Sequence, residues 1–210
     1  PPRRLRSPEV SLDWDGKPSE AVFIKSMLTP GMTSGLLAAL LVAALPAAET
    51  LRVEASRDAW ISSYPSEQEG NNGGASKLKL KGTQEFFLID FDATKFRGKR
   101  VVSATLHLHL ESSFPLGRTT VSTIAQEWVE GQGTGYAKEP GATSFRWART
   151  GEQRWNGDGK DITAVTLGLG GSLWGFGDPT PPDANRWQAI PIDPAVVQAR
   201  LDGRSYGFLV

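Results

Sequence analysis

The chain contains two histidines, which stand two residues apart, and a glutamate follows them at the same spacing. The segment 104–113 reads ATLHLHLESS, so a β-strand would place His107, His109 and Glu111 on one face. Imidazole and carboxylate ligands suit zinc or copper, but a zinc site needs three or four protein ligands and the chain has no cysteine. The leucines alternate with these polar residues, so we interpret the segment as a long strand with its leucines in a core and its histidines outward. Metal binding stays open at this point.

A second candidate metal site is the segment NGDGKD at residues 156–161, which has oxygen ligands at alternating positions and glycines for a turn. Calcium prefers such ligands, but Lys160 stands where a further acid would help, and no glutamate occupies the twelfth position. Asp58 and Asp92 could ligate a structural calcium only if the fold brings them together. We therefore interpret residues 156–161 as a polar turn and expect no cofactor, with a structural calcium as the one open alternative.

The sequence contains no complete catalytic signature. P-loop, G-x-S-x-G, H-E-x-x-H and G-x-G-x-x-G patterns are all missing. Asp90 and Asp92 could serve glycoside hydrolysis as a carboxylate pair, but they adjoin a very apolar strand, which favours a structural role. We expect the protein not to be an enzyme.

Aromatic and cationic side chains gather in the loops after Gly131, and their chemistry suits sugar. Trp and Tyr stack on the apolar faces of sugar rings, while arginine pairs with acidic groups in a bidentate manner. The candidate ligand-binding residues are Tyr136, Trp147, Arg149, Arg154, Trp155, Trp174, Arg186 and Trp187. The alternative for each Trp is that it closes the end of a core. Lys77, Lys79 and Lys81 form a basic stripe that could contact an acidic polymer, but we interpret it as the solvated face of a strand.

Composition narrows the class of protein. The 210 residues carry 23 basic and 23 acidic side chains, which gives no charge signature for nucleic acid or an anionic membrane surface. Without cysteine, neither a disulfide framework nor a thiol nucleophile can form. The 23 Gly, 14 Pro and 7 Trp favour a turn-rich β protein over a helix bundle.

The organisation of the chain suggests export. Residues 35–45 form an apolar run too short to span a bilayer, and Ala47 and Ala48 follow it, which fits a signal peptide at residues 32–48. A buried helix is the alternative. Residues 1–31 are polar without a sustained period, so we expect an unstructured extension or a wrongly assigned start, outside the fold. The mature chain, residues 49–210, is then secreted, and export without disulfides suggests a bacterial origin.

Residues 49–210 show many short strand patterns separated by turn residues. The clearest are residues 51–55, 59–64, 77–81, 85–92, 101–111, 119–129, 162–169, 186–192 and 205–210. Pro194 to Leu201 is the one predicted helix, capped by Asp193 and followed by Gly203. Residues 170–185 form a long Gly/Pro loop that we interpret as functional or disordered. These patterns predict an all-β, antiparallel, jelly-roll-like sandwich, apparently truncated because its last strand pattern ends at residue 210.

The order of several motifs resembles the DNRLRE, or disaggregatase-related, extracellular modules, which overlap the alginate-binding carbohydrate-binding modules of family 96. The resemblance rests on DAWI at 58–61, Asn72-Gly73 with Leu78 and Leu80, FLIDFD at 87–92, VSATLHLHL at 102–110, EWVE at 127–130 and YGFLV at 206–210. The name-giving DNRLRE string is absent, and the family's final strands would follow residue 210. The resemblance implies a secreted, non-catalytic module, often attached to polysaccharide-degrading or cell-surface proteins.

From the residues and the resemblance together we expect a secreted module that binds polysaccharide, with an acidic polysaccharide favoured by the arginines. The alternative is a structural or adhesive module of a larger cell-surface protein, without a sugar site. Nucleic acid and, after signal cleavage, membrane are not expected partners, and further domains could follow downstream.

Overall fold

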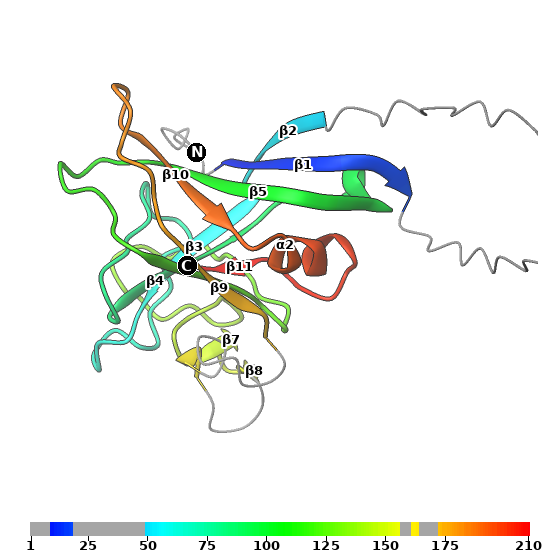
Figure 1. Ribbon diagram of the computed structural model, residues 1–210. Helices are drawn as coiled ribbons and strands as arrows, with labels where there is room; N and C mark the ends of the chain where they lie inside the picture. The colour runs from blue at the N-terminus through cyan, green and yellow to red at the C-terminus, as the bar shows by residue number, and fades with distance from the viewer. Residues whose placement is uncertain (1–8, 19–48, 156–160, 164–171) are drawn as a thin grey trace, which may run out of the picture.

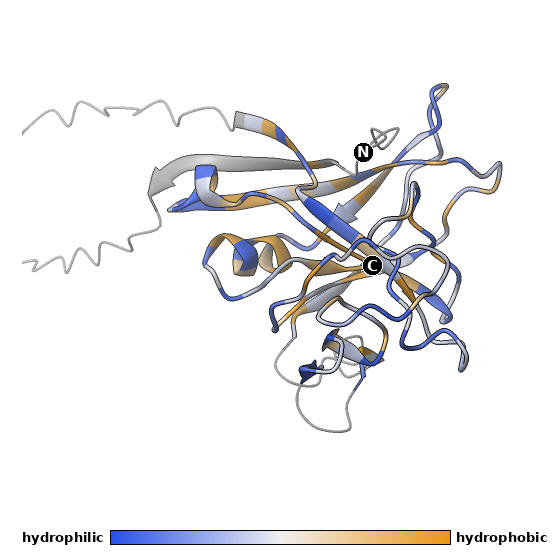
Figure 2. Ribbon diagram, turned by 180° about the vertical axis from the view of Figure 1, so that it is seen from behind, coloured by the Kyte–Doolittle hydropathy of each residue, from blue (hydrophilic) through white to orange (hydrophobic). Residues whose placement is uncertain are grey.

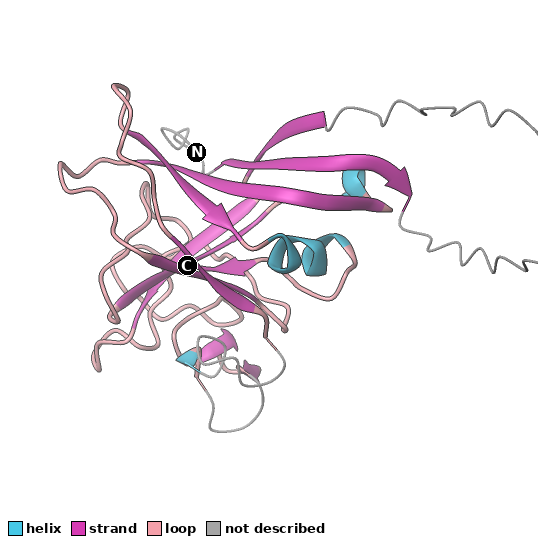
Figure 3. Ribbon diagram, viewed as in Figure 1, coloured by secondary structure: helices cyan, strands magenta, loops and turns pink. Residues whose placement is uncertain are grey.

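The computed structural model describes residues 9–18, 49–155, 161–163 and 172–210. Two antiparallel sheets and a small hairpin make up its strands, with one short α-helix, which confirms the expected all-β, sandwich-like fold (Figures 1 and 3). The described residues contain no helix that is long and apolar enough to cross a membrane. The expected signal peptide at 32–48 lies outside the described residues.

The first sheet has the strand order β10-β5-β1-β2, the second has the order β3-β4-β11-β6-β9, and β7 and β8 pair by themselves. The elements in chain order are β1 (Glu9–Pro18), β2 (Glu49–Glu54), β3 (Arg57–Ser62), β4 (Glu85–Asp90), the 3-10 helix η1 (Thr94–Phe96), β5 (Lys99–His109), β6 (Thr119–Thr123), β7 (Trp147–Arg149), β8 (Gln153–Arg154), β9 (Trp174–Gly177), β10 (Trp187–Ile192), α2 (Pro194–Leu201) and β11 (Phe208–Leu209).

The main core lies between the two sheets. In β5, Leu106 and Leu108 are buried in this core, while His107 and His109 are half-buried on the opposite face, as the alternation predicts. Strands β4, β6 and β11 add Phe87, Val121 and Phe208 from the other sheet, together with further residues of the same core. Figure 2 shows hydrophobic stretches along the strands near the centre of the molecule and mostly hydrophilic loops at its periphery.

A second core covers the outer face of β3, β4 and β11. Leu88 of β4 packs there, while its neighbours Phe87 and Ile89 belong to the main core. The second core is closed by Trp128, Phe145 and Trp155 from the long segment after β6, with other residues of that segment. Strand β4 is therefore buried on both faces, which explains its continuous apolar sequence.

Helix α2 closes the end of the sandwich where β5 begins (Figure 1). Asp193 caps the helix by accepting a hydrogen bond from the Ala195 backbone N–H at 2.8 Å, and Pro194 occupies the first turn. The Gln198 side chain then accepts from the Val101 N–H at 2.9 Å and donates to the Lys99 carbonyl at 3.2 Å. Val196 and Val197 of the helix are buried in the main core. The predicted helix and its cap are confirmed.

Two segments that we expected outside regular structure form strands. Residues 9–18, which the sequence analysis placed outside the fold, form β1 between β2 and β5. Trp174 to Gly177, in the predicted loop 170–185, form β9, which pairs with β6. Strand β1 has ten residues, and Val10, Leu12 and Trp14 alternate with polar residues in its sequence, which is a strand pattern that the expectation for residues 1–31 did not take into account. Strand β9 has four residues and pairs with a segment far away in the sequence, so no local pattern distinguishes it from a loop.

Other segments that the sequence predicts as strands do not form strands among the described residues. Residues 77–81 alternate strictly in sequence, yet only Lys81 makes a bridge, to Glu85. Leu78 and Leu80 still pack against the main core. The alternation in the sequence therefore reflects which side chains are buried, although the backbone of this segment is not paired in a sheet. Residues 164–169 of the predicted strand 162–169 lie outside the described residues.

Strand β11 lies between β4 and β6, and the main chain of Val210 exchanges two hydrogen bonds with Phe87, at 2.9 and 3.0 Å. The predicted last strand pattern is therefore paired on both sides. The expectation of further strands after residue 210 stays a prediction.

Candidate functional site

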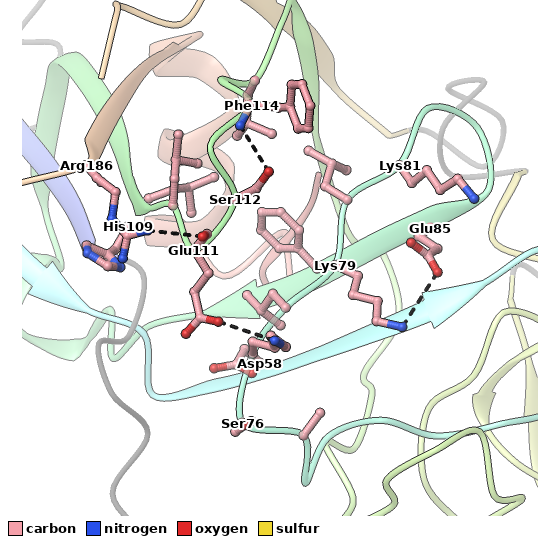
Figure 4. Close-up of a pocket in the computed structure, with 18 residues that line it drawn as sticks. Asp58, Ser76, Lys79, Lys81, Glu85, His109, Glu111, Ser112, Phe114 and Arg186 are labelled. Atoms are coloured by element: carbon pink, nitrogen blue, oxygen red, sulfur yellow. Dashed lines mark hydrogen bonds and ion pairs between the residues drawn. The ribbon is translucent and has the colours of Figure 1, made fainter. Parts of the chain in front are cut away.

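A cavity of about 910 Å³ opens at the end of the sandwich where β5 ends, opposite the end that α2 closes. Figure 4 shows its lining residues. They come from residues 75–81, from residues 108–112 with Phe114 and Leu116, and from Asp58, Glu85, Phe87 and Arg186. We call this cavity the groove. Four of its residues are Lys or Arg, so cationic side chains from distant parts of the chain meet at one place.

One wall of the groove is the segment 75–81, and its leucines hold it in place. Leu78 and Leu80 are half-buried and pack against the main core. Because successive side chains of an extended segment point to opposite sides, this packing turns the lysines at 77, 79 and 81 away from the core. The wall is thus a firmly attached strip that presents amino groups.

The facing wall is the loop 110–116, which two other residues hold. The Leu110 N–H donates to the Arg186 carbonyl at 2.9 Å. The buried Gln188 side chain accepts from the Leu116 N–H at 2.9 Å and donates to the Leu116 carbonyl at 3.1 Å. Both walls are therefore fixed by hydrogen bonds and packing, which keeps the groove formed without a ligand.

Two of the lysines are already partnered. Lys77 Nζ lies 3.3 Å from Glu111 Oε2, and both side chains are more than half exposed. Lys79 Nζ lies 4.0 Å from Glu85 Oε1 and donates to the Tyr136 hydroxyl at 3.1 Å. The hydrogen bond to Tyr136 raises the pKa of Lys79, so this group remains cationic at neutral pH.

Lys79 also sits over an aromatic ring. Its Nζ lies 4.3 Å from the ring centroid of Trp60, and the rings of Trp60 and Tyr136 meet edge-to-face at 5.1 Å. A lysine held in this way by a ring and a hydroxyl loses much of its rotational freedom. Lys79 is therefore a fixed charge beside the groove.

Lys81 and Arg186 differ from the other cations, because neither forms an ion pair with a carboxylate among the described residues. Both are exposed. Arg186 donates one Nη1 hydrogen bond to the Glu111 carbonyl at 3.1 Å, which orients the guanidinium and leaves donors available. In Figure 4 Lys81 extends from its loop without a marked interaction. These two side chains are the groove's available anion-binding groups.

Apolar surface accompanies these charges. Phe114 at the rim is 79% exposed, more than any other large hydrophobic side chain among the described residues. His109 packs edge-to-face against Trp187, with ring centroids 5.5 Å apart. The groove thus combines cationic donors with an exposed aromatic face, the two kinds of group that recognise an acidic sugar.

The structure distributes the eight predicted ligand-binding residues over separate places. Arg186 lines the groove. Trp187 packs against His109 and Tyr136 accepts a hydrogen bond from Lys79, and both of these partners are groove residues. Trp155 is fully buried and donates its indole N–H to the Ser144 carbonyl at 2.9 Å, so its ring offers no face to a ligand. Trp174 lies on β9 and is 45% exposed.

The remaining three predicted residues belong to the small β7–β8 hairpin. Arg154 stacks over Trp147 at 3.8 Å from the ring centroid, and Trp147 donates its indole N–H to Glu69 at 3.5 Å. Arg149 bonds Gln153 within the same hairpin, at 3.1 Å. These contacts occupy the side chains in local structure, so the eight residues do not form one binding platform.

The segment 77–81 and the loop with Phe114 line the groove, but they are not among the predicted ligand-binding residues. The sequence predicts the lysine stripe as the solvated face of a strand, and Lys77 and Lys81 are exposed. The signal that could have singled it out is the combination of three lysines with two anchoring leucines next to a predicted strand end. That Arg186 faces the same space depends on the pairing of β10 with β5, which no local pattern encodes.

Among the described residues, the candidate metal ligands are not brought together. The described residues contain no group of three or more His, Asp or Glu side chains that could hold a metal ion. The Asp92 carboxylate accepts from both the backbone N–H and the hydroxyl of Thr94, at 2.9 and 2.6 Å, and these bonds lower the pKa of Asp92. Residues 156–160 of the predicted calcium loop lie outside the described residues.

Comparisons with protein-family models, with curated proteins and with solved structures gave no match. The resemblance to the DNRLRE modules therefore rests on the sequence motifs alone.

Proposed function

We propose that the protein is a secreted, non-catalytic module that binds polysaccharide, and that it holds an acidic polysaccharide in the groove. The observation that carries the proposal is that Lys81 and Arg186, which form no ion pair with a carboxylate of the described residues, both line a preformed groove with an exposed aromatic rim. The resemblance to DNRLRE modules agrees with this proposal, but it does not identify any residue of the groove as a binding residue.

The chemistry of an acidic sugar matches these groups. Separate carboxylates along an acidic polymer would accept charge-assisted hydrogen bonds from Arg186 and from Lys81, which contribute about 1.5–3 kcal/mol each. The ring of Phe114 would cover the apolar face of a neighbouring sugar unit. Lys77 and Lys79 add positive potential, while Glu111 and Glu85 neutralise much of it locally. The two available cations therefore dominate the affinity.

The groove's carboxylates favour binding over hydrolysis. Glycoside hydrolysis uses two carboxyl groups that flank the scissile bond, one of them free to act as a base or nucleophile. Here Glu111 pairs with Lys77 and Glu85 neighbours Lys79. Asp58, the third carboxylate of the groove, is buried. Of the two carboxylates considered from the sequence, Asp90 is buried between two arginines and serves the fold, while Asp92 accepts hydrogen bonds from Thr94.

Native electrophoresis in gels that contain polygalacturonate or alginate tests the proposal. We expect both gels to retard the wild-type protein. The double variant Lys81→Gln/Arg186→Gln should bind at least about tenfold more weakly, since two charge-assisted hydrogen bonds are lost.

The matched control is Lys95→Gln/Arg97→Gln, which removes the same charge from two exposed positions, one in η1 and one directly after it, near the start of β5. It should be retarded like the wild type. Absence of wild-type retardation in both acidic gels would leave the structural or adhesive alternative, and equal retardation of the two double variants would remove the groove as the site.

A further inference from the structure

Strand β9 carries two exposed aromatic residues on its outer face. Trp174 is 45% and Phe176 60% exposed, and their rings meet at 5.2 Å with an interplanar angle of 86°. Two rings at right angles form an apolar corner in which one ring offers its face and the other its edge. Neighbouring exposed aromatic side chains of this kind can mark a binding surface.

The position of this corner is fixed from behind by glycines. Gly175 and Gly177 alternate with the two aromatic residues and so point to the opposite side of the strand. A Cβ on Gly177 would lie 2.4 Å from Ile190 Cγ2 and 2.5 Å from the Pro191 carbonyl oxygen. The strand therefore packs closely against β10 and cannot turn its rings inward.

Polar groups flank the corner at short range. Arg118 lies over the Phe176 ring at 5.8 Å and forms a bidentate pair with Asp178, at 2.7 and 3.2 Å. Thr120, directly opposite Phe176 on β6, is exposed, and its hydroxyl has no partner among the described residues. The Arg118–Asp178 pair neutralises its own charge and still offers hydrogen-bond donors and acceptors.

We propose that Trp174 and Phe176 form a second carbohydrate-binding surface, separate from the groove, for an uncharged polysaccharide. A pyranose ring would stack on one aromatic face with its edge against the other ring, while Thr120 and Arg118 bond its hydroxyls. The surface shares no lining residue with the groove. The local charge is balanced, which suits a neutral sugar and not an acidic one.

The size of the surface argues against a protein partner. A stable protein interface buries about 800 Å² on each side, usually with a broad apolar centre. Here the apolar centre consists of two rings, and a charged pair and a hydroxyl border it directly. A single sugar unit fits that scale.

The test uses the full chain in native gels that contain hydroxyethylcellulose or galactomannan. We expect at least one of these neutral polymers to retard the wild type and not to retard Trp174→Ala/Phe176→Ala. The variant Trp174→Tyr/Phe176→Tyr keeps both rings and should retain the retardation. The control Tyr64→Ala/Tyr206→Ala removes two other exposed rings and should bind like the wild type.

Circular dichroism and the thermal midpoint establish that each variant is folded. If the alanine pair is unfolded, the single variant Phe176→Ala, at the more exposed of the two positions, takes its place and should lose the retardation. Equal retardation of the alanine pair and the wild type would overturn the proposal. Absence of wild-type retardation in both neutral gels would also overturn it. In that case, light scattering that shows self-association of the wild type but not of the alanine pair would identify the two rings as a contact between copies of the chain. The acidic gels report the groove independently, so failure of one site is distinguishable from failure of the other.

Discussion

Arg200 of α2 and Asp90 of β4 form a bidentate ion pair across 110 residues of sequence, with distances of 2.6 and 3.1 Å. Arg57 of β3 adds a third bond to the same carboxylate at 3.0 Å, and the Asp90 side chain is only 5% exposed. This buried carboxylate ties the helix that closes the sandwich to two strands of one sheet. It identifies Asp90 as a structural residue.

Replacing Asp90 by Ala leaves two arginines without their buried counter-charge. Breaking a buried ion pair by removing one partner costs about 3–5 kcal/mol, and we expect the free energy of unfolding to fall by that amount. Urea denaturation measures it. The control Asp178→Ala breaks the exposed bidentate pair with Arg118 and should cost less than about 1 kcal/mol. Similar losses for the two variants would contradict the structural role of Asp90.

Asn71 joins two loops that are distant in the sequence. Its fully buried side chain donates to the Glu130 and Thr143 carbonyls at 2.7 and 2.9 Å, and its Oδ1 accepts from the N–H groups of Gly73 and Gly133. We expect Asn71→Ala to lower the free energy of unfolding by at least about 2 kcal/mol, because buried backbone groups lose their partners.

Hydrogen exchange should locate the effect of Asn71→Ala in residues 70–74 and 130–143, and denaturation gives its size. The matched control is Asn185→Ala, an exposed position where the described residues offer the side chain no partner. That variant should be close to neutral. An Asn71→Ala protein as stable as the control would show that water replaces the amide without cost.

Gly177 lets β9 approach β10, and its replacement tests how firmly the aromatic corner is held. A Cβ at this position would approach both Ile190 and the backbone of Pro191, so β9 must shift. We expect Gly177→Ala to cost about 1–3 kcal/mol, as overpacking does. The control Gly117→Ala meets no neighbour and should be neutral or slightly stabilising. Thermal unfolding separates the two outcomes, and a stable Gly177→Ala protein would mean that β9 is loosely packed.

The sequence predicts the core strands well, because their side-chain alternation is a direct consequence of burial. Leu106 and Leu108 face inward with the predicted period, and the three consecutive buried residues 87–89 reflect a strand between two cores. Helix α2 was equally predictable, since Asp193 and Pro194 act locally. In these elements local preference and tertiary packing agree.

The candidate sites were less predictable, because they depend on pairings between distant segments. Trp155 and Trp174 have similar glycine-rich surroundings in the sequence, yet one is fully buried and the other 45% exposed. The difference arises from the second core, which covers Trp155 and leaves β9 outside. Likewise, Arg186 lines the same groove as the lysine segment because β10 pairs with β5. The residue types in the sequence indicate the kind of ligand that a site could bind, but they do not predict which side chains are exposed and lie in the same place.

Glu69 provides a test of the electrostatics around the β7–β8 hairpin. Lys138 Nζ donates to Glu69 Oε2 at 2.6 Å, and the Trp147 indole donates to the other carboxylate oxygen at 3.5 Å. These bonds, the one from Lys138 first, lower the pKa of Glu69 below its ordinary value of 4.5. The ionised form is therefore favoured in the folded state. The resulting stability is fully present above pH 4.5 and is lost as the pH falls through the lower folded-state pKa.

Carboxyl titration followed by NMR should place the pKa of Glu69 below 4.5 in the folded protein. Lys138→Gln removes the larger cause and should raise this pKa toward 4.5, and Trp147→Phe should raise it by less. The stability difference between the wild type and Glu69→Gln should be constant near neutral pH and shrink in acid below pH 4.5. It should stay under about 1 kcal/mol, because both partners are exposed. A pKa that Lys138→Gln leaves unchanged would show that this ion pair does not form in solution.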